Sequence, residues 1–331
     1  MGAHALDKEL EDLAASARAA LVREIEASGA WATDPVWRAA FAALPRHVFV
    51  PYYYVGVLGG YERRWGEHPD PQARERWVKG AYADTPLATR LRDGELLSSS
   101  SQPSLMALML AALEVRDGDR VLEIGAGSGY NAALLTRRLG DGDLVTTIDL
   151  EPEITESARR HLGAAGYHPV VVTGDGARGV PERAPFDRII ATCALPSIPP
   201  AWLSQCRPGG RILTPLATGL VLLTVAGPGQ AEGRFLDTSA YFVPLRGGGR
   251  SEPAQAEQAG LGAVPRRGRE DDLFRFLFAL TRGSLDPQEA YALWEREGRP
   301  RRERYGITVT GHGEWAWLDD PEGPYAWPLP G

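Results

Sequence analysis

The stretch Val121-Leu-Glu-Ile-Gly-Ala-Gly-Ser-Gly-Tyr130 decides the fold of this chain. An apolar run that carries one acidic residue passes into three glycines at alternate positions and continues into the helical pattern of residues 131–139. Glycine tolerates backbone angles that other residues resist, and it has no side chain to hold a ligand away from the main chain. The stretch therefore predicts a strand, a ligand-binding turn and a helix.

Two further acidic residues follow at the ends of strand-like runs. Asp149 ends the run 144–149, and Asp175 lies in the Gly-Asp-Gly turn 174–176 after the run 170–173. A carboxylate about twenty residues beyond a glycine-rich turn is placed to bind the two hydroxyls of a ribose. The pattern predicts a nucleoside site.

The spacing of the glycines distinguishes this site from a dinucleotide site. The dinucleotide fingerprint G-x-G-x-x-G binds a pyrophosphate, whereas this chain has E-x-G-x-G-x-G and no nearby residue suited to neutralise phosphate. The pattern resembles motif I of the S-adenosylmethionine-dependent methyltransferases, which implies S-adenosyl-L-methionine as cofactor and an adenine contact from Asp175. The implied cofactor-binding residues are Glu123, Gly125, Gly127, Gly129, Asp149, Leu150, Gly174, Asp175 and Gly176. The alternative is a glycine-rich turn in some other α/β protein.

Composition bounds the class of protein. Of 331 residues, 44% are hydrophobic and 24% charged, which is typical of a soluble globular protein. No run reaches the ~20 apolar residues of a membrane span, and the first residues lack a signal peptide's pattern. Cys193 and Cys206 are the two cysteines, and the net charge is −7. We therefore expect a cytoplasmic protein with no disulfide framework, no metal, no membrane contact and no nucleic-acid partner.

From residue 103 onward, helical and extended patterns alternate, which predicts a doubly wound, mostly parallel sheet. The last two strand patterns, 219–226 and 234–243, have no helix between them and predict an antiparallel edge. This is the layout of a Rossmann-like class I methyltransferase. The first expected region, residues 1–97, is an N-terminal helical and acceptor-side region with an insertion or long loop at 56–80. It is followed by the methyltransferase core (98–246), a linker (246–262) and a small α+β C-terminal appendage (263–331).

Within these regions the periodicity predicts individual elements. Helices are expected at 6–28, 35–44, 103–113, 271–280 and 286–294, extended pieces between 82 and 97 with a break at Asp93-Gly94, and paired strands at 307–310 and 314–318. His47, Cys193 and the tryptophans at 315, 317 and 327 are expected to pack or hydrogen-bond rather than to act on a ligand.

A wider resemblance concerns the methyl acceptor. The segments that carry it are Leu44-Pro-Arg-His-Val-Phe-Val-Pro51, Ser101-Gln-Pro103, Asp117–Gly125, Pro185-Phe-Asp-Arg-Ile-Ile190 and Arg207-Pro-Gly-Gly-Arg211. They resemble the protein-L-isoaspartate O-methyltransferase family over roughly residues 20–55 and 82–246. That family esterifies a carboxylate at isoaspartyl positions in proteins or peptides. A carboxylate is already ionised at neutral pH, so the reaction needs orientation more than a general base.

The resemblance also assigns roles at the entrance of the helix at 103. Ser101 would be the catalytic hydroxyl that positions the carboxylate, with Ser99 lining the same pocket and Ser100 and Gln102 contacting the substrate. The structural alternative is a polar approach to a helix, in which one of these serines is the N-cap and Pro103 lies in the first turn. Both can hold together.

The chain departs from the compact repair enzymes of that family at three places. It has Leu96-Leu-Ser-Ser-Ser100 before Gln102, the insertion at 56–80 and the C-terminal appendage. In these features it is similar to the peptide-aspartate methyltransferases of ribosomal-peptide (lanthipeptide, lasso and graspetide) biosynthesis, whose aspartyl ester cyclises to an aspartimide. That function is the leading hypothesis, isoaspartyl repair is the alternative, and a non-catalytic adaptor that binds S-adenosylmethionine is a remote third.

Overall fold

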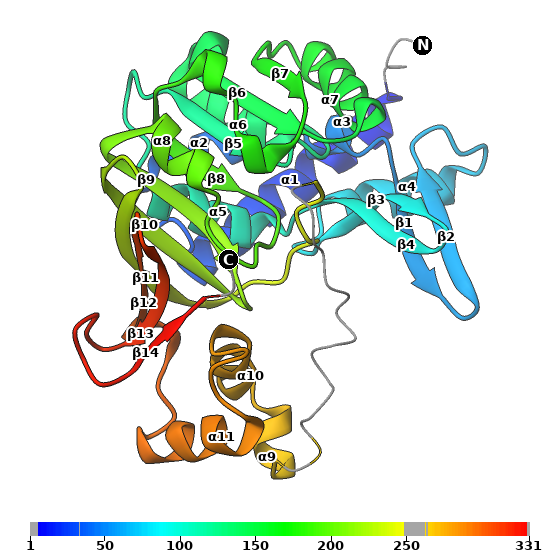
Figure 1. The fold of residues 1–331 in the computed structure, drawn as a ribbon. Helices are drawn as coiled ribbons and strands as arrows, with labels where there is room; N and C mark the ends of the chain where they lie inside the picture. The colour runs from blue at the N-terminus through cyan, green and yellow to red at the C-terminus, as the bar shows by residue number, and fades with distance from the viewer. Residues whose placement is uncertain (1–5, 33, 248–261, 263, 330–331) are drawn as a thin grey trace. The chain divides into compact units, whose positions relative to one another are not determined.

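The computed structural model describes residues 6–32, 34–247, 262 and 264–329, and it divides into two compact units, residues 1–174 and 175–331 (Figure 1). In the described ranges, no helix has both the length and the apolar character that a membrane span requires. Most of the predicted linker, residues 248–261, lies outside the described residues.

The first unit begins with three helices. Their bounds are α1 (Lys8–Ser28), α2 (Val36–Ala43) and α3 (Arg46–Phe49). The Asp7 carboxylate accepts a hydrogen bond from the Leu10 N–H and starts α1, and Gly29 at φ 75° ends it. The helices expected at 6–28 and 35–44 are therefore confirmed, with α2 one residue later than the proline at 35 suggested.

The prediction of an insertion or long loop at 56–80 is wrong, because the segment has regular secondary structure. The segment contributes to strands β1 (Tyr52–Val57) and β2 (Gly60–Trp65) and to helix α4 (Pro71–Ala81). Strands β1 and β2 form an antiparallel hairpin in which Tyr52 pairs with Trp65. The Arg63 guanidinium lies 4.4 Å from the centre of the Tyr52 ring. A cation over an aromatic ring stabilises the hairpin without the apolar alternation that marks a half-buried strand.

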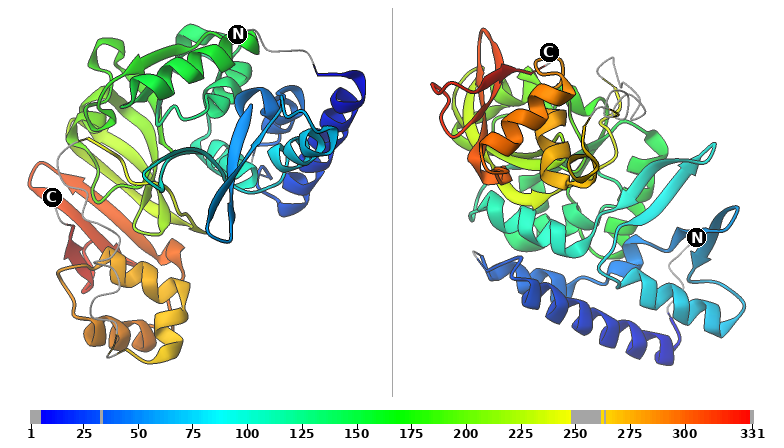
Figure 2. Two further views of the ribbon diagram at one scale, coloured as in Figure 1. Left: turned by 90° about the vertical axis from the view of Figure 1, so that its right-hand side faces the viewer. Right: turned by 90° about the horizontal axis from the view of Figure 1, so that it is seen from below.

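A second hairpin completes this sheet. Strands β3 (Leu87–Arg92) and β4 (Glu95–Ser100) are joined by Asp93 and Gly94, both at positive φ. This confirms the extended pieces and the turn expected there. The four strands are antiparallel in the order β2-β1-β3-β4, and Figure 2 shows the two hairpins side by side. Strand β4 is an edge strand, and it leads directly into Ser101.

The rest of the first unit alternates helices and strands. The elements are α5 (Pro103–Leu113), β5 (Val121–Ile124), α6 (Tyr130–Leu139), β6 (Val145–Asp149), α7 (Pro152–Ala164) and β7 (Val170–Thr173). Strands β5, β6 and β7 are parallel in that order, and β5 is buried on both faces. Burial on both faces is characteristic of a parallel sheet covered by helices. The α/β prediction is confirmed.

The second unit contains one mixed sheet. Its strands are β8 (Phe186–Ala191), β9 (Cys206–Leu216), β10 (Gly219–Gly227), β11 (Gln230–Ser239), β12 (Tyr305–Thr310), β13 (Gly313–Leu318) and β14 (Ala326–Pro328). Strands β8 and β9 are parallel and are connected by α8 (Pro200–Gln205), whereas the later pairs are antiparallel. Because β12 pairs with β11, the strands of the C-terminal segment extend this sheet instead of forming a sheet of their own.

Three helices lie between β11 and β12 in the chain and pack on one another (Figure 2). They are α9 (Arg266–Glu270), α10 (Asp272–Leu280) and α11 (Pro287–Arg296). Asp286 and Glu289 form a capping box at the start of α11. Phe274 and Trp294 are buried between α10 and α11, and Trp317 and Trp327 are buried on β13 and β14. Helices α10 and α11 and the packing of Trp317 and Trp327 were expected from the sequence, whereas α9 was not, and Trp315 is half-buried.

Candidate active site

The glycine-rich turn after β5 has the backbone geometry that its sequence predicts. Gly125, Gly127 and Gly129 have φ angles of 98°, 50° and 84°, in the region that favours glycine. The Gly125 N–H donates to the Ile148 carbonyl oxygen at 2.8 Å, which fixes the turn to β6. A methyl group at position 127 would lie 3.3 Å from the Ser99 carbonyl oxygen. The turn therefore packs directly against the last residues of β4.

Asp149 connects two of the predicted cofactor loops. It ends β6 and is half-buried, as is Leu150 after it. The Asp149 Oδ2 accepts a hydrogen bond from the Gly127 N–H at 3.2 Å, and the Asp149 carbonyl oxygen accepts one from the Gly174 N–H at 2.9 Å. The side chain thus lies at the carboxyl end of a parallel strand, where α/β sheets bind their ligands.

Glu123 lies beneath the turn. Its side chain is 1% exposed, and its two carboxylate oxygens accept hydrogen bonds from Asn131 Nδ2 at 2.7 Å and from Thr147 Oγ1 at 2.6 Å. Burial raises the pKa of Glu123 to about 7, and the two hydrogen bonds oppose that rise. Glu123 therefore joins β5, β6 and α6 under the glycine turn, and a direct contact with the cofactor stays a prediction.

The raised pKa of Glu123 predicts a pH-dependent stability. Between about pH 4.5 and pH 7 the folded chain keeps a proton on Glu123 that the unfolded chain has lost, so stability falls as the pH rises through this window. The contribution is about 3 kcal/mol at most. In Glu123→Gln the difference in unfolding free energy between pH 5 and pH 8 should shrink by a measurable part of this amount. An identical pH dependence in the two proteins, measured by urea unfolding, would contradict the assignment.

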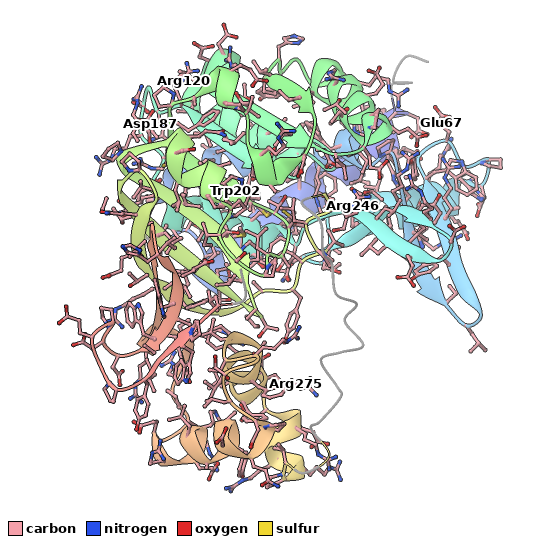
Figure 3. The ribbon with its side chains drawn as sticks, in the orientation of Figure 1. Glu67, Arg120, Asp187, Trp202, Arg246 and Arg275 are labelled. Atoms are coloured by element: carbon pink, nitrogen blue, oxygen red, sulfur yellow. The ribbon has the colours of Figure 1, made fainter. Side chains whose placement is uncertain are left out.

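Asp175 begins the second unit and caps the short 3₁₀ helix η2 (Gly176–Arg178). Its Oδ1 accepts a hydrogen bond from the Ala177 N–H at 2.9 Å. Trp202, fully buried on α8 and labelled in Figure 3, donates its indole N–H to the Gly176 carbonyl oxygen at 2.8 Å. Gly247 has φ 103°, and a methyl group there would lie 2.6 Å from Asp175 Oδ1. Trp202 and Gly247 therefore shape this loop, although neither was expected from the sequence.

Arg46 fixes the main chain that leads to Ser101, the predicted catalytic serine. The residue is fully buried, and its guanidinium donates to the carbonyl oxygens of residues 81, 83, 85, 100 and 101 at 3.0–3.4 Å. A sixth bond goes to Ser100 Oγ at 3.4 Å. Burial lowers the pKa of Arg46 to about 10, so it remains charged at neutral pH. One side chain thereby fixes both the 81–85 turn and the end of β4.

The four serines of residues 98–101 divide into two pairs. Ser98 and Ser100 are 6% and 4% exposed, and their hydroxyls accept hydrogen bonds from Thr89 Oγ1 and from Arg46. Ser99 and Ser101 are half-buried. Within the described ranges the Ser101 hydroxyl has no hydrogen-bond partner, and Arg46 bonds instead to the Ser101 carbonyl oxygen. The Ser99 main chain and the Ser98 hydroxyl lie beside the glycine turn. Ser99 and Ser101 are more exposed than their neighbours, and Ser100, a predicted substrate contact, is turned into the protein.

The N-terminus of α5 is capped by a residue that sequence reasoning missed. Gln102 is the N-cap position but makes no capping hydrogen bond, and no serine of 98–101 caps the helix. Instead Asp84 accepts hydrogen bonds from the Ser104 N–H at 2.8 Å and from Gln102 Nε2 at 3.1 Å. The expectation of a serine cap is therefore wrong, and the amide of Gln102 supports the helix start.

The comparisons with known proteins agree with this geometry. Residues 71–248, more than half of the chain, match the family model of protein-L-isoaspartate(D-aspartate) O-methyltransferase. The chain belongs to this family. It is 35% identical to a protein-L-isoaspartate O-methyltransferase of Aeropyrum pernix over 70% of this chain and 80% of that one. It is 44% identical to the enzyme of that name from Anaeromyxobacter dehalogenans over 58% of this chain and 91% of that one.

A solved structure extends the likeness to the fold. A protein-L-isoaspartate O-methyltransferase superposes with a TM-score of 0.63 at 24% identity, and the match covers 92% of this chain and all of the other. A match of this length must include residues of the C-terminal segment 263–331. The Rossmann-like class I methyltransferase fold is thus confirmed, and so is the class of enzyme, an S-adenosyl-L-methionine-dependent protein-L-isoaspartate O-methyltransferase.

His47, the other conspicuous residue of the segment 44–51, has a packing role in this methyltransferase. Its Nδ1 lies 2.7 Å from the Tyr82 hydroxyl, and its ring meets Trp77 edge to face. Burial, with a smaller effect from Arg18, lowers the pKa of His47 to about 4, so the imidazole is neutral at physiological pH. Among the described residues, no cluster of His, Cys, Asp or Glu has the geometry to hold a metal ion.

Proposed function

We propose that this chain transfers a methyl group from S-adenosyl-L-methionine to the carboxylate of an L-isoaspartyl residue in a protein or peptide. One observation carries the proposal beyond family membership: the half-buried pair Ser99 and Ser101 continues an edge strand that packs on the glycine turn. The Ser99 main chain and the glycine turn pack on each other within one compact unit, 1–174, which supports an acceptor site beside the cofactor turn.

The residues fit the parts of the cofactor by their chemistry. Asp149 would accept hydrogen bonds from the ribose hydroxyls, and Asp175, supported by Trp202, would accept one from the adenine amino group. When bound, S-adenosyl-L-methionine supplies a methyl group on a sulfonium, so its transfer to a carboxylate oxygen yields a methyl ester and S-adenosyl-L-homocysteine. The glycines at 125, 127 and 129 let the main chain approach the cofactor closely, and Leu150 would cover the adenosine.

Ser101 would orient the acceptor. Its hydroxyl is uncommitted within the described ranges and can donate to one carboxylate oxygen, which leaves the other oxygen directed at the methyl carbon. No proton needs to be removed from an ionised carboxylate. The site agrees with this, because the neutral His47 is engaged with Tyr82 and is not placed as a base.

The peptide-maturation hypothesis uses the same chemistry on a different acceptor. In both cases the ester is a better leaving group than a carboxylate, and the neighbouring amide nitrogen displaces methanol to close a succinimide. The features that favoured maturation were the segment 96–100, the insertion and the appendage. Because a solved protein-L-isoaspartate O-methyltransferase matches 92% of this chain, the appendage does not separate the chain from enzymes of that name. The matching family model and the relatives compared above carry the isoaspartyl name, so the isoaspartyl acceptor is the better-supported proposal. A cytoplasmic location without nucleic-acid partners stays a prediction.

The variant Ser101→Ala tests the proposal at the acceptor site. With an isoaspartyl peptide we expect the wild type to form a methyl ester and Ser101→Ala to lose about 10–100-fold in kcat/KM, the effect of one orienting hydrogen bond in a desolvated site. The dissociation constant of S-adenosyl-L-methionine should change less than about twofold.

Ser204→Ala is the matched control, because Ser204 is an exposed helical serine bonded to the Ala201 carbonyl oxygen. It should retain wild-type kinetics. An isoaspartyl peptide that is not methylated by the wild type would overturn the proposed function, and full activity in Ser101→Ala would overturn the role of the hydroxyl.

A further inference from the structure

The loop that follows β8, residues 192–199, lies at the carboxyl end of a parallel strand in the second unit. Ligands of α/β proteins bind at the carboxyl ends of their strands. The residues predicted to bind the cofactor follow β5, β6 and β7, and none lies in this loop. The loop is therefore a candidate for contact with the acceptor.

Three different elements hold the main chain of this loop. The Ala194 N–H donates to the Val243 carbonyl oxygen, and the Ala194 carbonyl oxygen accepts from the Leu245 N–H, both at 2.9 Å. These bonds come from the segment 240–247, which also carries Arg246, labelled in Figure 3. The Leu195 N–H donates to the carbonyl oxygen of residue 215 on β9 at 3.3 Å.

The third element is the C-terminal segment, through Glu314 on β13. Both carboxylate oxygens of Glu314 accept from the Ile198 N–H, at 2.8 and 3.1 Å. The hydrogen-bonded residues of the loop therefore flank Pro196, which is exposed, and Ser197, which is half-buried. The loop tip is presented between two fixed ends.

Glu314 is a half-buried carboxylate beside apolar residues of the sheet. It pairs in register with Val309, and the next positions on that face of the β12–β13 hairpin, Ala316 and Ile307, are completely buried. Burial raises the pKa of Glu314 to about 7, and the hydrogen bond from the Ile198 N–H opposes that rise. An apolar side chain would suit this face of the sheet better, because burying a carboxylate opposes folding. The packing of the sheet therefore does not explain the residue.

We propose that Glu314 is a positioning residue that holds the 192–199 loop in the conformation that binds the acceptor peptide. The tip, Pro196 and Ser197, would contact the main chain of the acceptor peptide. The C-terminal segment would then determine how a substrate-specificity contact is positioned. This proposal rests on the proposed function.

The comparison of Glu314→Leu with Glu314→Gln tests the proposal in the full-length enzyme. In Glu314→Leu we expect KM for an isoaspartyl peptide to rise about 10-fold, which corresponds to the loss of one charged hydrogen bond. The value of kcat and the dissociation constant of S-adenosyl-L-methionine should stay within about twofold. Glu314→Gln should restore KM to within about threefold of the wild type, because its amide oxygen accepts from the same N–H.

Two further measurements complete the test. Amide hydrogen exchange at Ile198 should be faster in Glu314→Leu and close to wild type in Glu314→Gln, and this readout does not depend on the acceptor being isoaspartyl. Glu322→Leu, at an exposed turn after β13, is the matched control and should change neither quantity. The proposal is overturned by an unchanged KM in Glu314→Leu, by unchanged exchange at Ile198, or by a Gln variant that behaves like the Leu variant.

Discussion

Replacing Asp149 by alanine should lower the affinity for S-adenosyl-L-methionine by about 100-fold or more, measured by isothermal titration calorimetry. In the proposed function the carboxylate accepts hydrogen bonds from the two ribose hydroxyls, and a hydrogen bond to a charged group contributes about 1.5–3 kcal/mol. The same substitution removes the acceptor of the Gly127 N–H, so the glycine turn also loses one of its anchors. Each 1.4 kcal/mol is tenfold in affinity, and the two effects act in the same direction.

Two variants separate these effects. Asp149→Asn keeps an oxygen for the Gly127 N–H but loses the charge, and it should lie between the wild type and the alanine variant. Asp143→Ala removes an exposed carboxylate just before the start of β6, at the other end of the strand, and it should bind the cofactor like the wild type. If Asp149→Ala bound S-adenosyl-L-methionine with unchanged affinity, the ribose site would lie elsewhere.

Replacing Arg46 by methionine should destabilise the chain by about 3–5 kcal/mol, measured by urea unfolding. The substitution keeps an apolar stem of similar volume but leaves five carbonyl oxygens without their shared donor. Unpaired buried polar groups cost more than the hydrogen bonds are worth in the intact network. Because two of these oxygens belong to Ser100 and Ser101, kcat/KM for the acceptor should fall as well, even at temperatures where the variant remains folded.

Arg46→Lys and Arg38→Met are the informative comparisons. Lysine keeps the charge but cannot span the 81–85 turn and β4 with a planar fork of donors, so it should recover only part of the stability. Arg38 is half-exposed and pairs with Glu26 on the surface, and its replacement by methionine should cost less than about 1 kcal/mol. A stable Arg46→Met variant with wild-type acceptor kinetics would refute the organising role of Arg46.

The cofactor half of the site was predictable because its signals are local. Three alternate glycines, a strand before them and a carboxylate at the end of the next strand specify a turn and a ligand within about thirty residues. The structure places Gly127 and Asp149 in hydrogen-bond contact, as that pattern requires. The strand-like runs that begin at 121, 144 and 170 coincide with β5, β6 and β7 to within one residue, and β5, which is buried on both faces, has the apolar sequence typical of a parallel strand.

The hairpin of β1 and β2 could not be predicted in the same way. Most of β2 is exposed, so its sequence Gly60-Tyr-Glu-Arg-Arg-Trp65 has no apolar alternation. Its cross-strand contact, the Arg63 guanidinium over the Tyr52 ring, becomes recognisable only when the two strands are already paired. Strand pairing of this kind depends on cross-strand neighbours more than on intrinsic propensity.

The residues that act through main-chain hydrogen bonds were missed for a related reason. Arg46 acts on carbonyl oxygens up to 55 positions away, and Glu314 acts on an amide 116 positions away. Main-chain partners are present at every residue and leave no mark in the sequence. The same holds for Asp84, which caps α5 from a turn 20 positions earlier. A sequence motif can identify an arginine or a glutamate as important, but its main-chain hydrogen-bond partners are known only from the structure.

The most direct test of the proposed function is the ratio of kcat/KM values for two peptides that differ only in the linkage at one residue. One peptide carries L-isoaspartate and the other ordinary L-aspartate, and methyl ester formation is followed by mass spectrometry with S-adenosyl-L-methionine in excess. The proposed function predicts that the isoaspartyl peptide is preferred by at least about 100-fold, since the added methylene in the main chain changes where the carboxylate lies relative to Ser101. A ratio near one, or a preference for the aspartyl peptide, would contradict it.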